Sequence, residues 1–162
     1  KKHAPTYSAF ALQSVPELYS PEALNDALRF EANTLASAIL RNDGSGKFTL
    51  EPLPTLSQLA PAMSIAPGDF DGDGKVDLAI GQNFFDAQRE TGRMNAGLGV
   101  ILTNAGGGGF EEVWPATSGF HHRGNLRQLR AVDLDGDGIL DLISANNDQP
   151  PVIHLGNSKV PD

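Results

Sequence analysis

Cysteine is absent from this sequence of 162 residues, and basic residues are scarce, with 12 lysines and arginines against 20 acids. The lack of cysteine excludes disulfides and metal sites built from thiolates. The few basic residues form no run, which argues against nucleic-acid binding. No apolar run approaches the length of a membrane-spanning helix, so we expect no insertion into a membrane.

Motifs for nucleophilic catalysis are also missing. The sequence has no Gly-x-Ser-x-Gly elbow, and without cysteine it has no thiol nucleophile. Carboxylates that could act as acid and base occur as Glu111 with Glu112 and as Asp86 with Glu90, but nothing in the sequence fixes their separation. We therefore expect these acids to be solvated surface charges and the protein not to be an enzyme.

The most specific feature that is present is a nine-residue acidic loop, which occurs at residues 69–77 and again at 133–141. Each copy has aspartates at positions 1, 3, 5 and 9 and glycines at positions 4 and 6. Converging carboxylates repel one another, and a bound cation offsets that repulsion. Side-chain oxygens at alternating positions, with a backbone carbonyl near position 7, suit Ca²⁺. The spacing predicts two calcium sites; the alternative is a pair of tight aspartate turns without an ion.

The EF-hand is the competing interpretation of such a loop. An EF-hand closes with a glutamate at position 12 and lies between two helices. Position 12 is Ile80 in the first copy and Ser144 in the second. The segments on both sides of each loop are short and largely apolar, as strands are. Each loop is therefore expected to join two strands, which excludes the EF-hand.

The formal net charge of −8 comes largely from these loops, which hold eight of the twenty acids. Two bound Ca²⁺ would halve that charge, so the acidity does not by itself indicate a basic partner. Loops of this kind fill most readily where calcium is abundant. This favours an extracytoplasmic location, whether secreted, periplasmic or at the cell surface.

An internal repeat sets the expected fold. Residues 38–42 recur as residues 100–104, and each copy is followed by a glycine-rich turn and a phenylalanine. The acidic loops recur at nearly the same offset, and eight of fifteen positions are identical between 69–83 and 133–147. Because eighteen glycines and eleven prolines favour many turns, the sequence predicts an all-β fold.

Each repeat predicts four antiparallel strands, the content of one β-propeller blade. The acidic loop is expected between the third and fourth strands of its blade, and residues 152–157 look like the start of another unit. The predicted strands lie near 36–41, 47–51, 62–67 and 76–82, and then near 98–103, 110–114, 127–133 and 140–145.

The domain organisation follows from this repeat. Ser20 as N-cap and Pro21 at the first helical position predict a short amphipathic helix over 21–33, which we expect to be a lid or linker packed on the β part. Other prolines break any helix in the preceding twenty residues. The expected segments are an N-terminal segment at 1–34, blades at 35–97 and 98–150, and the start of a further blade or a tail at 151–162.

The two acidic loops, each leading through Asp-Leu into a strand, resemble the VCBS and FG-GAP repeats of β-propellers such as those of integrin α chains. Over about residues 35–157 the chain is similar to bacterial secreted VCBS-repeat proteins of the UnbV/ASPIC-associated type. In such families the loops bind Ca²⁺ and hold the strands of a blade together. Carried over by position, the resemblance implies main-chain ligands at Lys75 and Ile139 and the side-chain ligands Asp69, Asp71, Asp73, Asp77, Asp133, Asp135, Asp137 and Asp141.

Propellers usually close with several more blades than the two and a fraction predicted here. The resemblance therefore implies a C-terminal fragment of a larger propeller, or an assembly that completes its open sheets between chains. The expected function is that of a calcium-binding, extracytoplasmic protein-interaction or adhesion module. The alternatives are a carbohydrate-binding, lectin-like propeller and an accessory domain of a secreted hydrolase or lyase. Expected partners are calcium and another protein or the rest of the same propeller, with a glycan or a second copy as alternatives.

Three further features have simpler structural interpretations. His121 and His122 lack a third ligand nearby, so we expect an exposed connector rather than a transition-metal site. Residues 106–109, all glycine, are expected to form a hairpin turn rather than a phosphate cradle. Trp114 and Phe120 are expected to pack in the core or between blades, although either ring type can also stack on a sugar.

Overall fold

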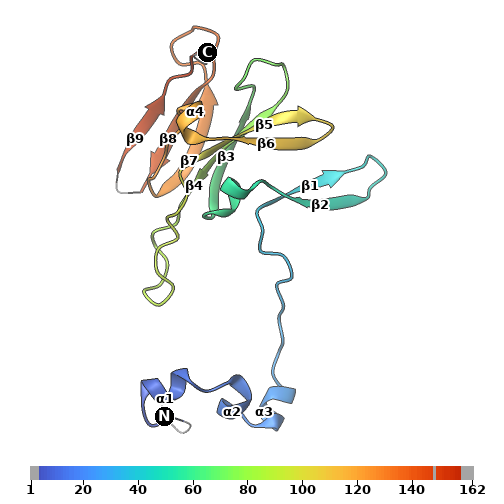
Figure 1. Cartoon of the computed structure of the whole chain (residues 1–162), viewed down its shortest axis with the longest axis vertical. Coiled ribbons are helices and arrows are strands. Elements are labelled where there is room, and N and C mark those ends of the chain that lie inside the picture. The colour runs from blue at the N-terminus through green and yellow to red at the C-terminus, as the bar shows by residue number, and fades with distance from the viewer. Residues whose placement is uncertain (1–3, 148, 158–162) are drawn as a thin grey trace. The chain divides into compact units, whose positions relative to one another are not determined.

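The computed structural model describes residues 4–147 and 149–157 (Figure 1). The chain divides into two compact units, residues 1–35 and residues 36–162. In the part of the chain that the structure describes, the first unit contains three short helices and the second contains nine strands. Among the described residues, no helix has both the length and the apolar character needed to span a membrane.

The N-terminal unit is held by local capping rather than by a core. Its helices are α1 (Tyr7–Ala11), α2 (Val15–Leu18) and α3 (Pro21–Asn25), and none of them buries a residue. The Ser20 side chain caps α3 by accepting a hydrogen bond from the N–H of Ala23 at 3.3 Å. The predicted start of this helix is therefore confirmed, whereas its predicted extension to residue 33 is wrong.

The early end of α3 has a physical reason. A short helix is stabilised mainly by packing of its apolar stripe, and beyond Asn25 that stripe has no partner, since Leu28 and Leu35 are 86 % and 90 % exposed. The prediction that no helix precedes residue 20 is also wrong, because α1 and α2 form there. In α2, Ser14 and Glu17 form a capping box, with Ser14 N–H donating to the Glu17 carboxylate at 2.7 Å.

The second unit is built from three antiparallel sheets in the orders β1–β2, β3–β4–β5–β6 and β7–β8–β9. Two short helices, η1 (Thr55–Gln58) and α4 (Pro115–Ser118), lie in the connections. All eight predicted strands are confirmed in position to within a few residues. The strands are β1 (Ala38–Asn42), β2 (Phe48–Pro52), β3 (Ala62–Gly68), β4 (Asp77–Gln82), β5 (Val100–Gly106), β6 (Gly109–Val113), β7 (Leu126–Val132), β8 (Asp141–Asn146) and β9 (Gln149–His154).

The grouping of strands into sheets differs from the one expected. The four-stranded sheet runs from β3 to β6, because β4 pairs with β5 through Leu78↔Leu102 and Ile80↔Val100. The expected set of β1 to β4 is instead split between two sheets. As a result the acidic loop joins the first and second strands of its sheet, and not the third and fourth as expected. The hairpin β5–β6 supplies the third and fourth strands of the sheet that begins with β3 and β4.

The C-terminal strand also belongs to a different sheet from the one expected. Residues 152–154, expected to begin another unit, lie in β9, which pairs with β8 as the third strand of the last sheet. Part of the predicted tail, residues 158–162, lies outside the described residues. The described chain therefore has one four-stranded sheet, one of three strands and one of two, and not two full blades.

The four-stranded sheet is buried on both faces, with successive side chains of each strand alternating between them. One face carries Ala79 and Ile101 into a cluster with residues of the last sheet, Leu126, Leu129 and Leu142. The other face carries a second apolar cluster, which contains Leu56, Ile80, Val100 and Leu102. The acidic loops extend from the ends of strands fixed by this core.

Candidate metal centres

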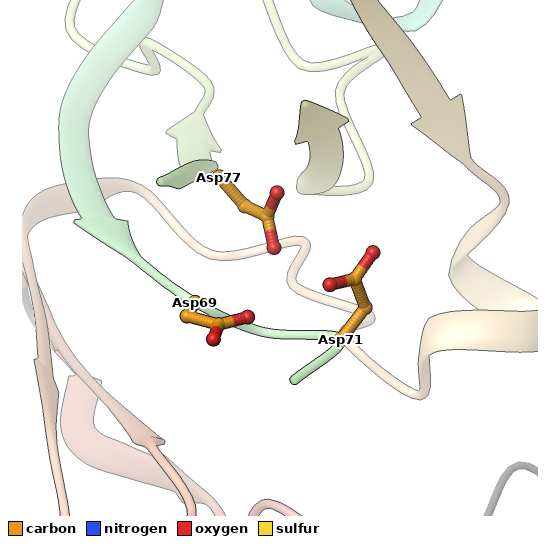
Figure 2. Close-up of side chains that lie close together, drawn as sticks. All are labelled: Asp69, Asp71 and Asp77. Carbon is orange, nitrogen blue, oxygen red and sulfur yellow. The ribbon is translucent and has the colours of Figure 1, made fainter. Parts of the chain in front are cut away.

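The first acidic loop leaves β3 after Gly68 and enters β4 at Asp77. Figure 2 shows the side chains of Asp69, Asp71 and Asp77 pointing toward a common space. One carboxylate oxygen from each lies within 4.8 Å of the others. The loop therefore brings together three of its four aspartates.

Hydrogen bonds within the loop fix this shape. The two Asp69 carboxylate oxygens accept from the N–H groups of Gly72 at 2.8 Å and Gly74 at 2.9 Å. Both glycines have positive φ, +78° and +82°, which other residues adopt only at a cost. The glycine spacing seen in the sequence is thus the spacing that lets the backbone turn around the first aspartate.

Asp77 anchors the loop to the sheet. Its side chain is fully buried, and its two oxygens accept from the N–H groups of Phe70 and Asn104, both at 2.8 Å. Phe70 belongs to the loop and Asn104 to β5, so one carboxylate joins the loop to a strand of the following repeat. Each oxygen keeps a second lone pair available for a metal ion.

The second acidic loop repeats the first in detail. Oxygens of Asp133, Asp135 and Asp141 lie within 4.8 Å of one another. Asp133 accepts from the two loop glycines at 2.7 and 3.0 Å, as Asp69 does. The buried Asp141 accepts from Leu134 N–H at 2.8 Å and from Gly156 N–H at 2.7 Å. The two loops differ only at their second, seventh and eighth positions, and equivalent hydrogen bonds form in both. The shared aspartates and glycines therefore account for the common geometry.

The position-5 aspartates lie outside the two triads. Asp73 forms an ion pair with Lys75 and accepts its N–H at 2.8 Å. The hydrogen bond from Lys75 lowers the pKa of the Asp73 carboxyl, and the same bond raises the pKa of Lys75. Asp137 accepts the N–H of Ile139 at 2.8 Å and has no such cation beside it. The roles of Asp73 and Asp137, and those of the Lys75 and Ile139 carbonyls, stay predictions.

Each triad offers only oxygen ligands and a concentration of negative charge, the donor set that Ca²⁺ takes. Position 12 lies in a strand in both copies, with Ile80 in β4 and Ser144 in β8, and both side chains are fully buried. Neither residue can reach an ion in its loop. The interpretation of each loop as a connection between two strands is confirmed, and the EF-hand is excluded.

Several of the other polar candidates have structural partners. Glu112 accepts the Leu56 N–H at 2.8 Å, and Asp86 is paired with Arg127. The expectation of an exposed connector at His121 and His122 is wrong for His122. That side chain is 4 % exposed, and its Nε2 lies 2.7 Å from Asn146 Oδ1.

Aromatic residues divide between the core and the surface. Phe120 is 2 % exposed in the cluster between the two larger sheets, which confirms the core interpretation, whereas Trp114 is 61 % exposed. His154, which the sequence did not single out, lies edge-on to Phe120 at 5.2 Å and 6.2 Å from the His122 ring. Burial lowers the pKa of both His122 and His154. No local signal marks His154, because its neighbours come from distant parts of the sequence.

Comparison with known protein families agrees with this geometry. The FG-GAP-like repeat family matches residues 27–80, and the FG-GAP repeat family matches residues 62–109. No curated protein matches the chain. The second match contains the complete first acidic loop with β3, β4 and β5, and FG-GAP repeats imply propeller blades. Residues 27–109 of this chain are therefore FG-GAP and FG-GAP-like repeats.

Proposed function

We propose that this chain is a calcium-binding β-propeller segment that acts as an extracytoplasmic protein-interaction or adhesion module, without catalysis of its own. The observation that carries the proposal is the matched pair of aspartate triads, built by equivalent hydrogen bonds in two loops. Calcium would act as a structural clip, because it offsets the repulsion among carboxylates held at the junction of two strands.

The proposed extracytoplasmic location is supported by the kind of calcium site that the exposed loops resemble. Most residues of the two loops are exposed, whereas Asp69 is half-buried and the last aspartate of each loop is buried. Calcium modules of extracellular proteins bind with dissociation constants of about 10⁻⁴ to 10⁻³ M. Such sites fill only where calcium is plentiful. A role without catalysis is in keeping with the contacts of Glu112 and Asp86, two of the four carboxylates considered for acid–base chemistry, since both are occupied in structural contacts.

The test is thermal unfolding of the chain in EGTA and then in stepped concentrations of Ca²⁺ or Mg²⁺. Calcium at 100 times the dissociation constant stabilises the folded state by about 2.7 kcal/mol per site. We expect a clear rise of the melting temperature with Ca²⁺ and little with Mg²⁺, which demands a stricter octahedron. Asp71→Ala in the first triad should lose the calcium response of that site. Glu90→Gln, which removes the same charge outside the loops, is its matched control and should keep the response. An identical response to both ions, or none to calcium, would refute the metal sites.

A carbohydrate-binding function is the second candidate, and one observation favours it. Trp114 is 61 % exposed after the end of β6, and an exposed indole ring can stack on a sugar. Phe120 does not support this function, because it is buried in the core. A glycan array without binding to the native chain would argue against it, as would equal binding by a Trp114→Ala variant.

A further inference from the structure

The end of the sheets opposite the acidic loops is rich in arginine. β4 begins at Asp77 and ends at Gln82, where the connector of residues 83–99 leaves the sheet. The segment of residues 119–125 reaches the same end, because it leads into β7 at Leu126, which pairs with Asn146 at the far end of β8. Figure 1 shows the acidic loops at the top of these sheets and the connector hanging below them. These two segments and the start of β7 contain Arg89, Arg93, Arg123 and Arg127.

The two segments contact each other. Asn83 Nδ2 donates to the Gly124 carbonyl and Phe85 N–H donates to Asn125 Oδ1, both at 3.4 Å. The connector itself folds back as a hairpin, with paired backbone hydrogen bonds of 2.9 and 3.0 Å between Phe84 and Met94. Arg93 and Arg127 therefore lie near the segment that carries Arg123, whereas Arg89 lies in the turn of residues 88–92 at the tip of the hairpin. We call the surface formed by residues 83–99 and 119–127 the arginine end.

Two of these arginines are positioned by aromatic rings. The Arg93 guanidinium lies 5.2 Å from the centre of the Phe85 ring, and that of Arg127 lies 5.4 Å from the centre of Phe84. A guanidinium stacked on a ring keeps its N–H edge free for a planar carboxylate. Arg127 already uses this edge to bind Asp86, which shows the geometry that such a pair takes here.

The arginines of this surface other than Arg127, namely Arg89, Arg93 and Arg123, have no carboxylate counter-ion among the described residues. Residues 83–99 and 119–127 together hold four arginines but only Asp86 and Glu90 as acids. This surface is formally positive in a chain whose net charge is −8.

We propose that the arginine end is a docking surface for an acidic segment of another protein, one that presents two or more carboxylates. The six residues of β4 separate the acidic loop at Asp77 from the arginine end at Gln82 by about 17 Å. This distance is roughly twice the electrostatic screening length at physiological salt. A short acidic segment can therefore bind the arginines without meeting the aspartates. This inference rests on the proposed interaction function and names the surface and the kind of partner for it.

The test uses the full chain in 1 mM Ca²⁺, with a fluorescent hexaglutamate peptide as probe and hexaglutamine as the uncharged control. Arg93→Gln with Arg123→Gln should weaken hexaglutamate binding about tenfold or more, since each lost charge-assisted contact has an effect of that order. Arg130→Gln, on exposed strand surface in β7, removes one positive charge outside the arginine end. It is the control for Arg93→Gln and Arg123→Gln made singly, and it should bind as the native chain does. Binding should also weaken as salt rises.

Three results would overturn the proposal. The first is equal hexaglutamate binding by the native chain and the double variant. The second is binding of oligogalacturonate without binding of hexaglutamate, which would point to an acidic glycan. The third is salt-sensitive self-association of the native chain without peptide that the double substitution abolishes, which would point to a second copy. The calcium-dependent melting temperature separates this proposal from the preceding one. The double variant should keep the rise of melting temperature with calcium. If it does so and no longer binds the peptide, the loss of binding is due to the arginines and not to the metal sites. A missing calcium response would refute the metal sites and leave the docking result to be judged separately.

Discussion

Replacing Asp77 by alanine should destabilise the protein even when calcium is absent. The Asp77 side chain is fully buried and accepts the N–H groups of Phe70 and Asn104. Alanine leaves both donors unsatisfied, at a cost of about 1–3 kcal/mol each, so the loss should be about 2–6 kcal/mol in EGTA. Urea unfolding followed by circular dichroism measures this free energy directly.

Asp71→Ala is the variant that separates folding from metal binding. Asp71 is exposed and accepts one hydrogen bond, from Asp73 N–H at 3.1 Å. Its loss in EGTA should therefore be small, about 0.5 kcal/mol. In saturating calcium the same variant should lose the stabilisation contributed by the first site, about 2.7 kcal/mol at 100 times the dissociation constant. Two results would refute this reasoning. One is a native free energy of unfolding for Asp77→Ala in EGTA. The other is an Asp71→Ala variant that loses as much free energy of unfolding as Asp77→Ala does, both in EGTA and in calcium.

Three smaller predictions concern a turn, the core and the buried histidines. Gly74→Ala should destabilise the protein by about 1–2 kcal/mol, because φ is +82° there, and a shift of the urea midpoint measures it. Gly81→Ala should cost about 1–3 kcal/mol, since the new Cβ would lie 2.5 Å from a leucine of β7; an unchanged midpoint would contradict this packing. Burial lowers the pKa of His122 and His154 below that of the unfolded chain, so their stability contribution is complete above about pH 6.5 and declines as the pH falls through that value. Urea midpoints between pH 7.5 and 5.5 should show this fall in a control His121→Gln variant and a weaker fall in His122→Gln.

The acidic loops could be predicted from the sequence because their structure is local. Asp69 binds the N–H groups of residues three and five positions ahead, and Asp133 does the same. Glycines at those positions supply the positive φ angles that the turn requires. The strand positions were equally predictable, because alternation of apolar residues and flanking turn residues are properties of short stretches.

Short stretches of the sequence were sufficient to predict the two aspartate loops and the approximate positions of β1 to β8, whereas the residues of β9 were assigned to a new unit. The sharing of strands among sheets is visible only in the folded chain, because pairing β4 with β5 instead of β3 with β2 depends on contacts between distant residues. The tertiary structure also decided that His122 is buried and that α3 ends at Asn25, since both depend on what packs against the side chains. Local hydrogen bonds and turn geometry are encoded in neighbouring residues, whereas burial and strand partners depend on segments that only folding brings together.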